Sequence, residues 1–462
     1  MQFGPVFIDL NSINLFFTNQ SPGAIFVQLL ALGGWLFVVK LLFIVGLSFW
    51  VDYKESRYTS SWKWVLLAVD IPALNLQTPK AVEQMFAHLA GALGHDNIAS
   101  KFWNGNKQRY FSFEIVSIDG YIQFLIRTEE ALRDLVEASV YAQYPEAEII
   151  EVEDYTEDKP SKFPDSVYNI WASDIALTEN DALPIRTFKD FEHNISKDTQ
   201  LKDPMSALLE SFSRIGTGEE IWFQIIIQPT DNSWKEKAIA KIKEKIGDTS
   251  GHGHGSNPIL DFIHNAPFKL IEFIGDQIFN REAGESGGHE EHEGPPNQLQ
   301  YLTPGESKLV EAMETKISKI GFKTKMRAIY IARKEVFSES RGVQALVGAL
   351  NQFNSPSANS LSPTFGVHMS YWRSSQRSAE RKGLLMKAYK KRKMNVGANS
   401  FILNIEELAT IWHFPMSYVK TPLLQKAVAK QSEPPASLPI ERIFDKSSEP
   451  EEKPEPPPMR FG

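Results

Sequence analysis

The fold class is decided by residues 109–127, which read RYFSFEIVSIDGYIQFLIR. Apolar and aromatic residues fill the two runs on either side of Asp119 and Gly120. These two residues readily adopt the positive φ angles of a two-residue hairpin turn, and the flanking runs are rich in residues that favour strands. The stretch therefore predicts two antiparallel strands joined at Asp119 and Gly120.

Helices and further strands are expected on both sides of this hairpin. Upstream, residues 64–72 read WVLLAVDIP, which is typical of a buried strand, and Thr78 with Pro79 marks the start of a helix. Downstream, Thr128 begins a second helical pattern, and the strand AEIIEVEDY follows it. The order β-α-β-β-α-β over residues 62–155 is that of a ferredoxin-like domain.

A second, looser α+β unit is predicted farther along the chain. Strands are indicated at residues 168–177 and 219–229, and a helical pattern follows each of them. A Gly-rich and His-bearing insert at residues 247–302 interrupts this unit. Three alternatives stay open for the apolar part of the insert, residues 257–279: it packs on its own domain, docks on a partner or lies on a membrane surface.

The N-terminal part contains one long apolar run with a single charge. Residues 24–51 carry only Lys40, and as a helix they would extend about 40 Å, enough to cross a hydrocarbon core of about 30 Å. No Lys or Arg precedes the run, whereas Lys54 and Arg57 follow it, which predicts a short N-terminus outside and the bulk in the cytoplasm. The expected location is the cell inner membrane. Lys40 would either meet a polar partner or extend towards the interface.

The predicted fold class is α+β, with an N-terminal transmembrane helix, tandem ferredoxin-like cytoplasmic domains and a disordered tail. The tail prediction rests on the proline-rich, acidic composition of the last part of the chain. The predicted segments are an extracytoplasmic N-terminus (1–23), the transmembrane helix (24–51), a ferredoxin-like domain (60–158), a second α+β domain (165–370) with the insert (247–302), a basic helix and short helical segment (371–431), and the tail (432–462).

Composition excludes several kinds of chemistry. The 462 residues include no cysteine, which excludes disulfides, thiol nucleophiles and cysteine metal sites. The phosphate-binding pattern G-x-x-x-x-G-K-[ST] is absent, and so is a G-x-S-x-G nucleophile elbow. His252, His254, His289 and His292 lie among glycines and are interpreted as linker residues. We therefore expect no catalytic residue, no metal and no cofactor, and we do not expect an enzyme.

The most polarised segment spans residues 373–393, where Glu380 is the only acid among many cations. A helix of this kind can contact nucleic-acid phosphates or anionic lipid headgroups. The alternative is that it pairs with the acidic run at residues 146–158. The polyanion-binding candidates are Arg373, Arg377, Arg381, Lys382, Lys387, Lys390, Lys391, Arg392 and Lys393.

Three groups of residues carry a family resemblance. They are PALNLQTPKAVEQMFAHL; LRDLVEASVYAQYPEAEIIEVEDY with EEIWFQIIIQP; and FILNIEELATIWHFP with TPLLQKAVAKQSEPPASLP. Over roughly residues 60–440 the chain resembles the membrane-proximal part of the DNA-pumping ATPases of type IV secretion and conjugation found in candidate-phylum bacteria. In those proteins a motor domain with a phosphate-binding loop follows, whereas here a proline-rich tail does.

The resemblance implies an assembly role without catalytic residues. The expected function is a single-pass membrane-anchored scaffold or adaptor of a conjugation-like transport apparatus. Its expected partners are a separately encoded P-loop ATPase or other secretion-system subunits. The alternative is a membrane-tethered protein that binds nucleic acid or anionic lipid through residues 373–393. Assembly into a homo-oligomer is left open.

Overall fold

The computed structural model describes most of the central part of the chain and two short N-terminal pieces. The described residues are 2–3, 6–7, 35–72, 75–94, 98–193, 200–201, 203–245, 302–368 and 373–416. Most of the insert, including its apolar part at residues 257–279, lies outside the described residues, and so do the tail and nearly all of the expected extracytoplasmic N-terminus.

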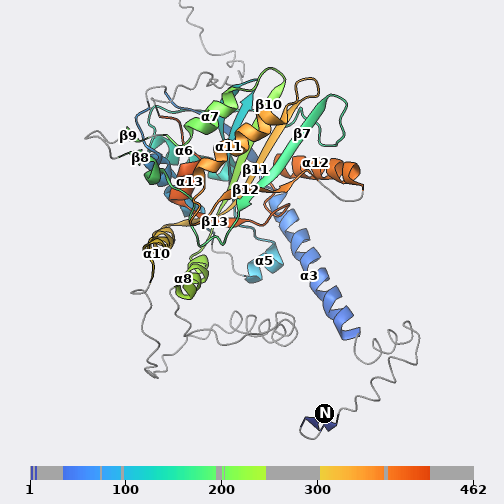
Figure 1. The fold of residues 1–462 in the computed structure, drawn as a ribbon. Coiled ribbons are helices and arrows are strands. Elements are labelled where there is room, and N and C mark those ends of the chain that lie inside the picture. The colour runs from blue at the N-terminus through green and yellow to red at the C-terminus, as the bar shows by residue number, and fades with distance from the viewer. Residues whose placement is uncertain are drawn as a thin grey trace, which may run out of the picture. The chain divides into compact units, whose positions relative to one another are not determined.

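The described residues build one large antiparallel sheet of nine strands (Figure 1). Eight strands lie in the order β12-β7-β11-β10-β4-β5-β3-β6, and β13 pairs with β11 beside this path. The strands are β3 (Trp64–Asp70), β4 (Phe111–Ile118), β5 (Tyr121–Glu129), β6 (Glu148–Glu151), β7 (Tyr168–Leu177), β10 (Glu219–Pro229), β11 (Gly321–Arg333), β12 (Leu361–Gly366) and β13 (Phe401–Asn404). Separate two-residue pairs are β1 (Gln2–Phe3) with β2 (Val6–Phe7) and β8 (Glu192–His193) with β9 (Gln200–Leu201).

The sheet consists of two halves with the same internal order. One half is β6-β3-β5-β4 and the other is β12-β7-β11-β10, so that in each the fourth strand along the chain is followed by the first, third and second. This is the strand order of a ferredoxin-like unit. The halves join where β4 pairs with β10, from Glu220 opposite Ile118 to Ile227 opposite Phe111. The two α+β units expected from the sequence therefore share one sheet.

Helices pack on both faces of the sheet. The helices are α3 (Trp35–Thr59), α4 (Pro79–Leu89), α5 (Ile98–Asn104), α6 (Arg133–Tyr141), α7 (Ser206–Ser213), α8 (Ser233–Lys245), α10 (Pro304–Ile317), α11 (Ala345–Leu350), α12 (Ser374–Lys390) and α13 (Ile405–Ile411). On one face, Phe113 of β4 packs against Phe86 of α4, and Ser117 donates a hydrogen bond to the backbone of α7. Successive strand residues point to opposite faces, so Glu114 and Val116, which alternate with Phe113 and Ser117, point to the other face.

An aromatic cluster fills the core beneath the first of these faces. Trp412 follows α13, is fully buried, and lies with its ring 4.8 Å from that of Phe113 and 4.9 Å from that of Phe414. The short helical segment expected within residues 371–431 is α13, where Asn404 and Glu407 form a reciprocal capping box at the helix start. The cluster thereby joins the C-terminal described segment to the first half of the sheet.

The expected transmembrane helix at residues 24–51 is corrected by the structure. No helix among the described residues is both long and apolar enough to cross a membrane. Helix α3 begins at Trp35, so the part of the expected span that it contains is about 25 Å long. The helix then continues through a charged stretch to Thr59. Residues 24–34 lie outside the described residues.

Candidate functional site

A row of polar side chains crosses four neighbouring strands on the face opposite α4 and α7. Direct pairing sets Asp174 of β7 beside Arg327 of β11, Arg327 beside Gln224 of β10, and Gln224 beside Glu114 of β4. All four side chains are buried. Buried charges are costly unless they are paired and hydrogen-bonded. We call these four residues the polar row.

Helix α12 and the two residues that follow it, Lys391 and Arg392, cover the Glu114 end of the polar row. The guanidinium of Arg392 donates to both carboxylate oxygens of Glu114, with Nε–Oε1 at 2.9 Å and Nη2–Oε2 at 3.0 Å. Arg392 also pairs with Asp154, and the Tyr155 hydroxyl donates to Glu114 at 2.8 Å. Burial alone would raise the pKa of Glu114, but the charge and hydrogen bonds of Arg392 outweigh burial and hold that pKa below its ordinary value.

The Asp174 end of the polar row is closed by the loop that follows α12. Asp174 accepts from Lys325 Nζ at 2.7 Å, from Arg327 Nε at 2.9 Å and from the backbone N–H of Ala398 at 2.7 Å. Gly397 has a φ angle of +89°, and a Cβ there would collide with the Asp174 carboxylate. Glycine at this position thus allows the loop to reach the carboxylate.

Another buried acid, Asp203, ties the end of the described segment at Met416 to the start of α7. Asp203 accepts from the backbone N–H groups of Met205 at 2.7 Å and Met416 at 3.0 Å. Its Oδ1 lies 3.0 Å from Nε2 of His413, whose Nδ1 donates to the Ala409 carbonyl at 2.8 Å. Burial alone would raise the pKa of Asp203, but His413 and the two N–H groups hold it below its ordinary value. His413 is therefore a buried, hydrogen-bonded core residue.

These buried acids predict that the fold is sensitive to acid. The pKa values of Glu114, Asp154 and Asp203 are lowered in the folded state, so protons bind more readily to the unfolded chain. The free energy of unfolding is therefore expected to stay constant near neutral pH. It is expected to fall once the pH drops below the ordinary carboxyl pKa of about 4. Glu220, whose pKa is raised by burial, opposes this trend.

Urea denaturation at a series of pH values measures this dependence. The Glu114→Gln variant is the matched control, because it removes one of the lowered carboxyl groups. Its unfolding free energy should change less steeply with pH below the ordinary carboxyl pKa than that of the unmodified chain. Equal slopes for the two proteins would contradict the assignment of acid sensitivity to the Arg392 pair.

The predicted polyanion-binding residues are divided between the interior and the surface. Arg392 is buried, whereas Arg381, Lys382 and Lys390 are half-buried and engage neighbouring groups. Arg381 lies over the Phe365 ring, Lys382 donates to Asn169 and Lys390 donates to the Lys159 carbonyl. The exposed members are Arg373, Arg377, Lys387, Lys391 and Lys393. Arg392 pairs with Asp154, which belongs to the acidic run at residues 146–158. At this one residue, the basic segment therefore pairs with the acidic run, which was the alternative to polyanion binding.

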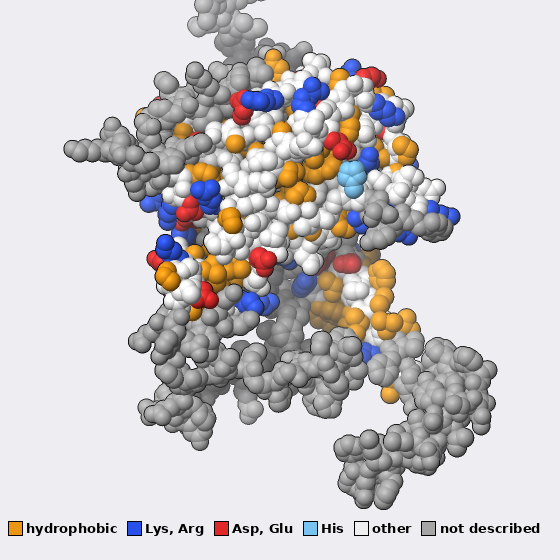
Figure 2. Space-filling view, in the orientation of Figure 1, with side chains coloured by type: hydrophobic (Ala, Val, Ile, Leu, Met, Phe, Trp, Pro, Cys, Tyr) orange, Lys and Arg blue, Asp and Glu red, His pale blue; other side chains and the backbone are white. Residues whose placement is uncertain are grey.

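Helix α3 exposes apolar side chains on several sides. Figure 2 shows hydrophobic side chains gathered along this helix, which projects from the sheet in Figure 1. Lys40, the polar residue singled out in the sequence, lies in α3 and is half-buried. The large hydrophobic side chains exposed on α3 are Trp35, Leu36, Val39, Leu41, Leu42, Phe43, Ile44, Val45, Phe49, Trp50 and Tyr53. We call these residues the α3 apolar surface.

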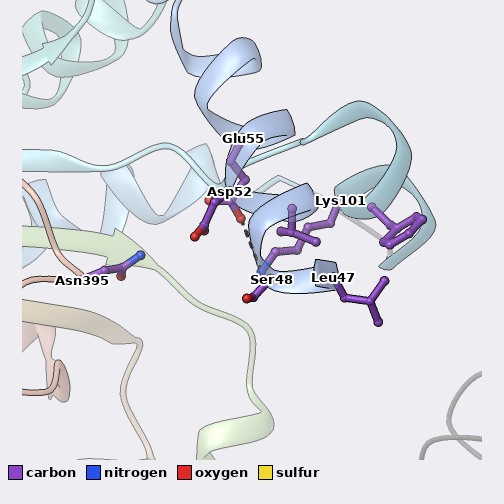
Figure 3. A pocket seen from close by; sticks show the side chains of 8 residues that line it. Leu47, Ser48, Asp52, Glu55, Lys101 and Asn395 are labelled. Atoms are coloured by element: carbon purple, nitrogen blue, oxygen red, sulfur yellow. Dashed lines mark ion pairs between the residues drawn. The ribbon is translucent and has the colours of Figure 1, made fainter. Parts of the chain in front are cut away.

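A pocket of about 430 Å³ lies at the base of the α3 apolar surface (Figure 3). Leu47, Ser48, Asp52 and Glu55 of α3 line it together with Lys101 of α5. The wall is completed by Val51, Phe102 and Asn395, the last from the loop that follows α12. The Glu55 carboxylate lies 3.6 Å from the Lys101 ammonium, so that an ion pair links α3 to α5. Apolar and charged side chains thus line the pocket together, at the point where α3 leaves the sheet.

Metal ligands do not gather anywhere in the part of the chain that the structure describes. No group of three or more His, Asp or Glu residues there could hold a metal ion. The histidines of the insert, His252, His254, His289 and His292, lie outside the described residues. The polar row was not predicted from the sequence, although a single charged residue within an apolar strand run, such as Glu114 in FSFEIVSI, is a visible signal of it.

Comparisons with known proteins identify a family without a known activity. A family model described as a domain of unknown function, DUF8128, matches residues 72–427. No curated protein matches the chain. The match names neither an ATPase nor a secretion or conjugation apparatus, so the expected placement in type IV secretion and conjugation is corrected to an uncharacterised family. Because the matched region covers most of the sequence, the chain belongs to the DUF8128 family.

Proposed function

We propose that the protein is an assembly scaffold or adaptor, rather than an enzyme, and that it binds a partner protein through the α3 apolar surface. The observation that carries this proposal is the exposure of that surface: Phe49 is 70% exposed and Leu42 is 63% exposed. Contiguous exposed apolar patches mark interaction sites, and a helix that is apolar all round is normally covered. Burying such side chains would stabilise a complex by about 1.5–3 kcal/mol for each one that is fully covered.

The base of α3 is fixed, which favours docking by a preformed helix. Glu55 pairs with Lys101 at 3.6 Å and with Lys107 at 3.1 Å. Trp50 Nε1 donates to the Phe102 carbonyl at 3.1 Å, and its ring lies 4.8 Å from the Lys54 ammonium. A helix that is already ordered and anchored loses less conformational entropy when it binds than a disordered segment does.

The proposed partner is a separately encoded P-loop ATPase. This partner is the one expected from the sequence, in which the 462 residues carry no G-x-x-x-x-G-K-[ST] pattern of their own. The polar row supports a structural role for the sheet, because its charges pair with one another and with the segment after α12. The inner-membrane location and the nucleic-acid or lipid alternative stay predictions from the sequence.

Affinity capture of the tagged full chain from cross-linked cells tests this proposal. The unmodified chain is expected to recover a P-loop ATPase, and Leu42→Glu with Phe43→Glu is expected to abolish recovery, because both positions are exposed on α3. Leu76→Glu is the matched control, since Leu76 is 75% exposed on the sheet domain. Recovery that is equal for both variants, or repeated failure to recover any P-loop ATPase, would contradict the proposal.

A further inference from the structure

One face of α12 carries exposed cations that have no ion-pair partner among the described residues. Its exposed positions 377, 380, 384, 387 and 391 recur every three or four residues, which places them on one side of the helix. Cations occupy most of these positions, with Glu380 and Leu384 between them. We call Arg377, Lys387, Lys391 and the following Lys393 the basic stripe.

An acidic ridge lies on and beyond the edge strand β6. Within the described part of the chain, β6 pairs with β3 alone, so its other side is an open sheet edge. Exposed acids lie before it, on it and in the loop that follows it. We call Glu146, Glu148, Glu157 and Asp158 the acidic ridge.

The loop end of the acidic ridge, with Glu157 and Asp158, lies beside α12. Asp154 pairs with Arg392 directly after this helix, and the Lys159 carbonyl accepts from Lys390 at 2.5 Å. Farther along, a Cβ on Gly383 would lie 3.3 Å from the Ser161 carbonyl oxygen. The loop that carries Glu157 and Asp158 therefore runs beside the helix that carries the cations.

The acids beside the basic stripe limit the kinds of partner that the stripe can bind. Nucleic acid and anionic membranes carry one sign of charge, so the acidic ridge would repel them beside the basic stripe. A partner that matches both surfaces needs an acidic patch next to a basic one. A second copy of this chain has that arrangement.

We propose that two copies of the chain associate through the basic stripe and the acidic ridge. A two-fold axis through the boundary between the two surfaces sets the stripe of each copy against the ridge of the other. Both contacts are attractive, and the same pair of surfaces is used twice, so assembly stops at a dimer. This interface involves α12 and β6 and is independent of partner binding through α3.

Sedimentation velocity with paired charge reversals tests the dimer. The unmodified full chain is expected to form dimers at about 0.05 M salt and to dissociate at about 0.5 M, because exposed charges are screened. Lys387→Glu with Lys391→Glu places two acids in the stripe, and Glu157→Lys with Asp158→Lys places two lysines in the ridge, so each pair of reversals cancels the net charge of its surface. Each variant alone is expected to bind itself at least about tenfold more weakly than the unmodified chain binds itself.

Mixing the two variants separates this proposal from its alternatives. The two introduced acids of one variant then face the two introduced lysines of the other, so the mixture is expected to recover the dimer. Three results would overturn the proposal: an unmodified chain that is monomeric at low salt, a dimer insensitive to both reversals, or no recovery on mixing. Binding of duplex DNA or anionic vesicles through the stripe without self-association would likewise overturn it. Association through α3 would persist at high salt.

Discussion

Replacing Arg392 by methionine is expected to lower the free energy of unfolding by about 3–5 kcal/mol. Arg392 is fully buried and gives two hydrogen bonds to Glu114, which is also fully buried. Methionine fills similar space but leaves a carboxylate without its counter-charge in a site closed to water. Burial would then raise the pKa of Glu114, and the folded chain would have to take up a proton.

Urea denaturation of Arg392→Met beside Lys391→Met measures this effect. Lys391 is the neighbouring residue and is exposed, so its replacement is expected to change stability by no more than about 0.5 kcal/mol. Adding Glu114→Gln to Arg392→Met removes the buried charge and is expected to restore part of the loss. Equal effects of the two single substitutions would show that the buried ion pair does not hold α12 on the sheet.

Replacing Trp412 by alanine is expected to cost about 3–5 kcal/mol of unfolding free energy. The indole is fully buried, and its ring lies within 6.5 Å of the rings of Phe86, Phe113, Phe124 and Phe414. Alanine would leave a cavity between α4, β4 and the C-terminal segment, where neighbouring rings cannot collapse fully. The loss should also loosen the segment that carries His413.

Thermal and urea unfolding of three variants checks this prediction. Trp103→Ala is the matched control, because Trp103 is 64% exposed and should contribute little. Trp412→Phe is expected to cost much less than Trp412→Ala, since it keeps most of the ring contacts and removes an indole N–H that has no hydrogen-bond partner among the described residues. Similar losses for Trp412→Ala and Trp103→Ala would contradict a central role for this cluster.

Local chemistry made some elements predictable from the sequence. The hairpin at Asp119 and Gly120 is confirmed, with φ angles of +54° and +89°, because the two residues favour that turn without help from the rest of the chain. The start of α13 is equally local, since Asn404 and Glu407 cap each other. Such features depend on neighbours a few residues away.

Contacts between distant segments could not be predicted in this way. Arg392 stands in a run of cations, which favours exposure, yet it is buried because Glu114 of β4 lies beneath it. The pairing of β4 with β10 also depends on tertiary structure, since either half of the sheet could have ended at that edge. The prediction of a spanning helix at residues 24–51 was wrong, because no helix among the described residues is both long and apolar enough to cross a membrane and α3 continues into a charged stretch.

The pairing of β4 with β10 determines whether the two halves of the sheet can be produced as separate fragments. Almost every residue of both strands is buried, so a fragment that contained only one half would expose a long, apolar strand edge. Edges of this kind template aggregation, which natural proteins avoid by covering them. Each half therefore shields the other from aggregation, and the two should be produced as one polypeptide.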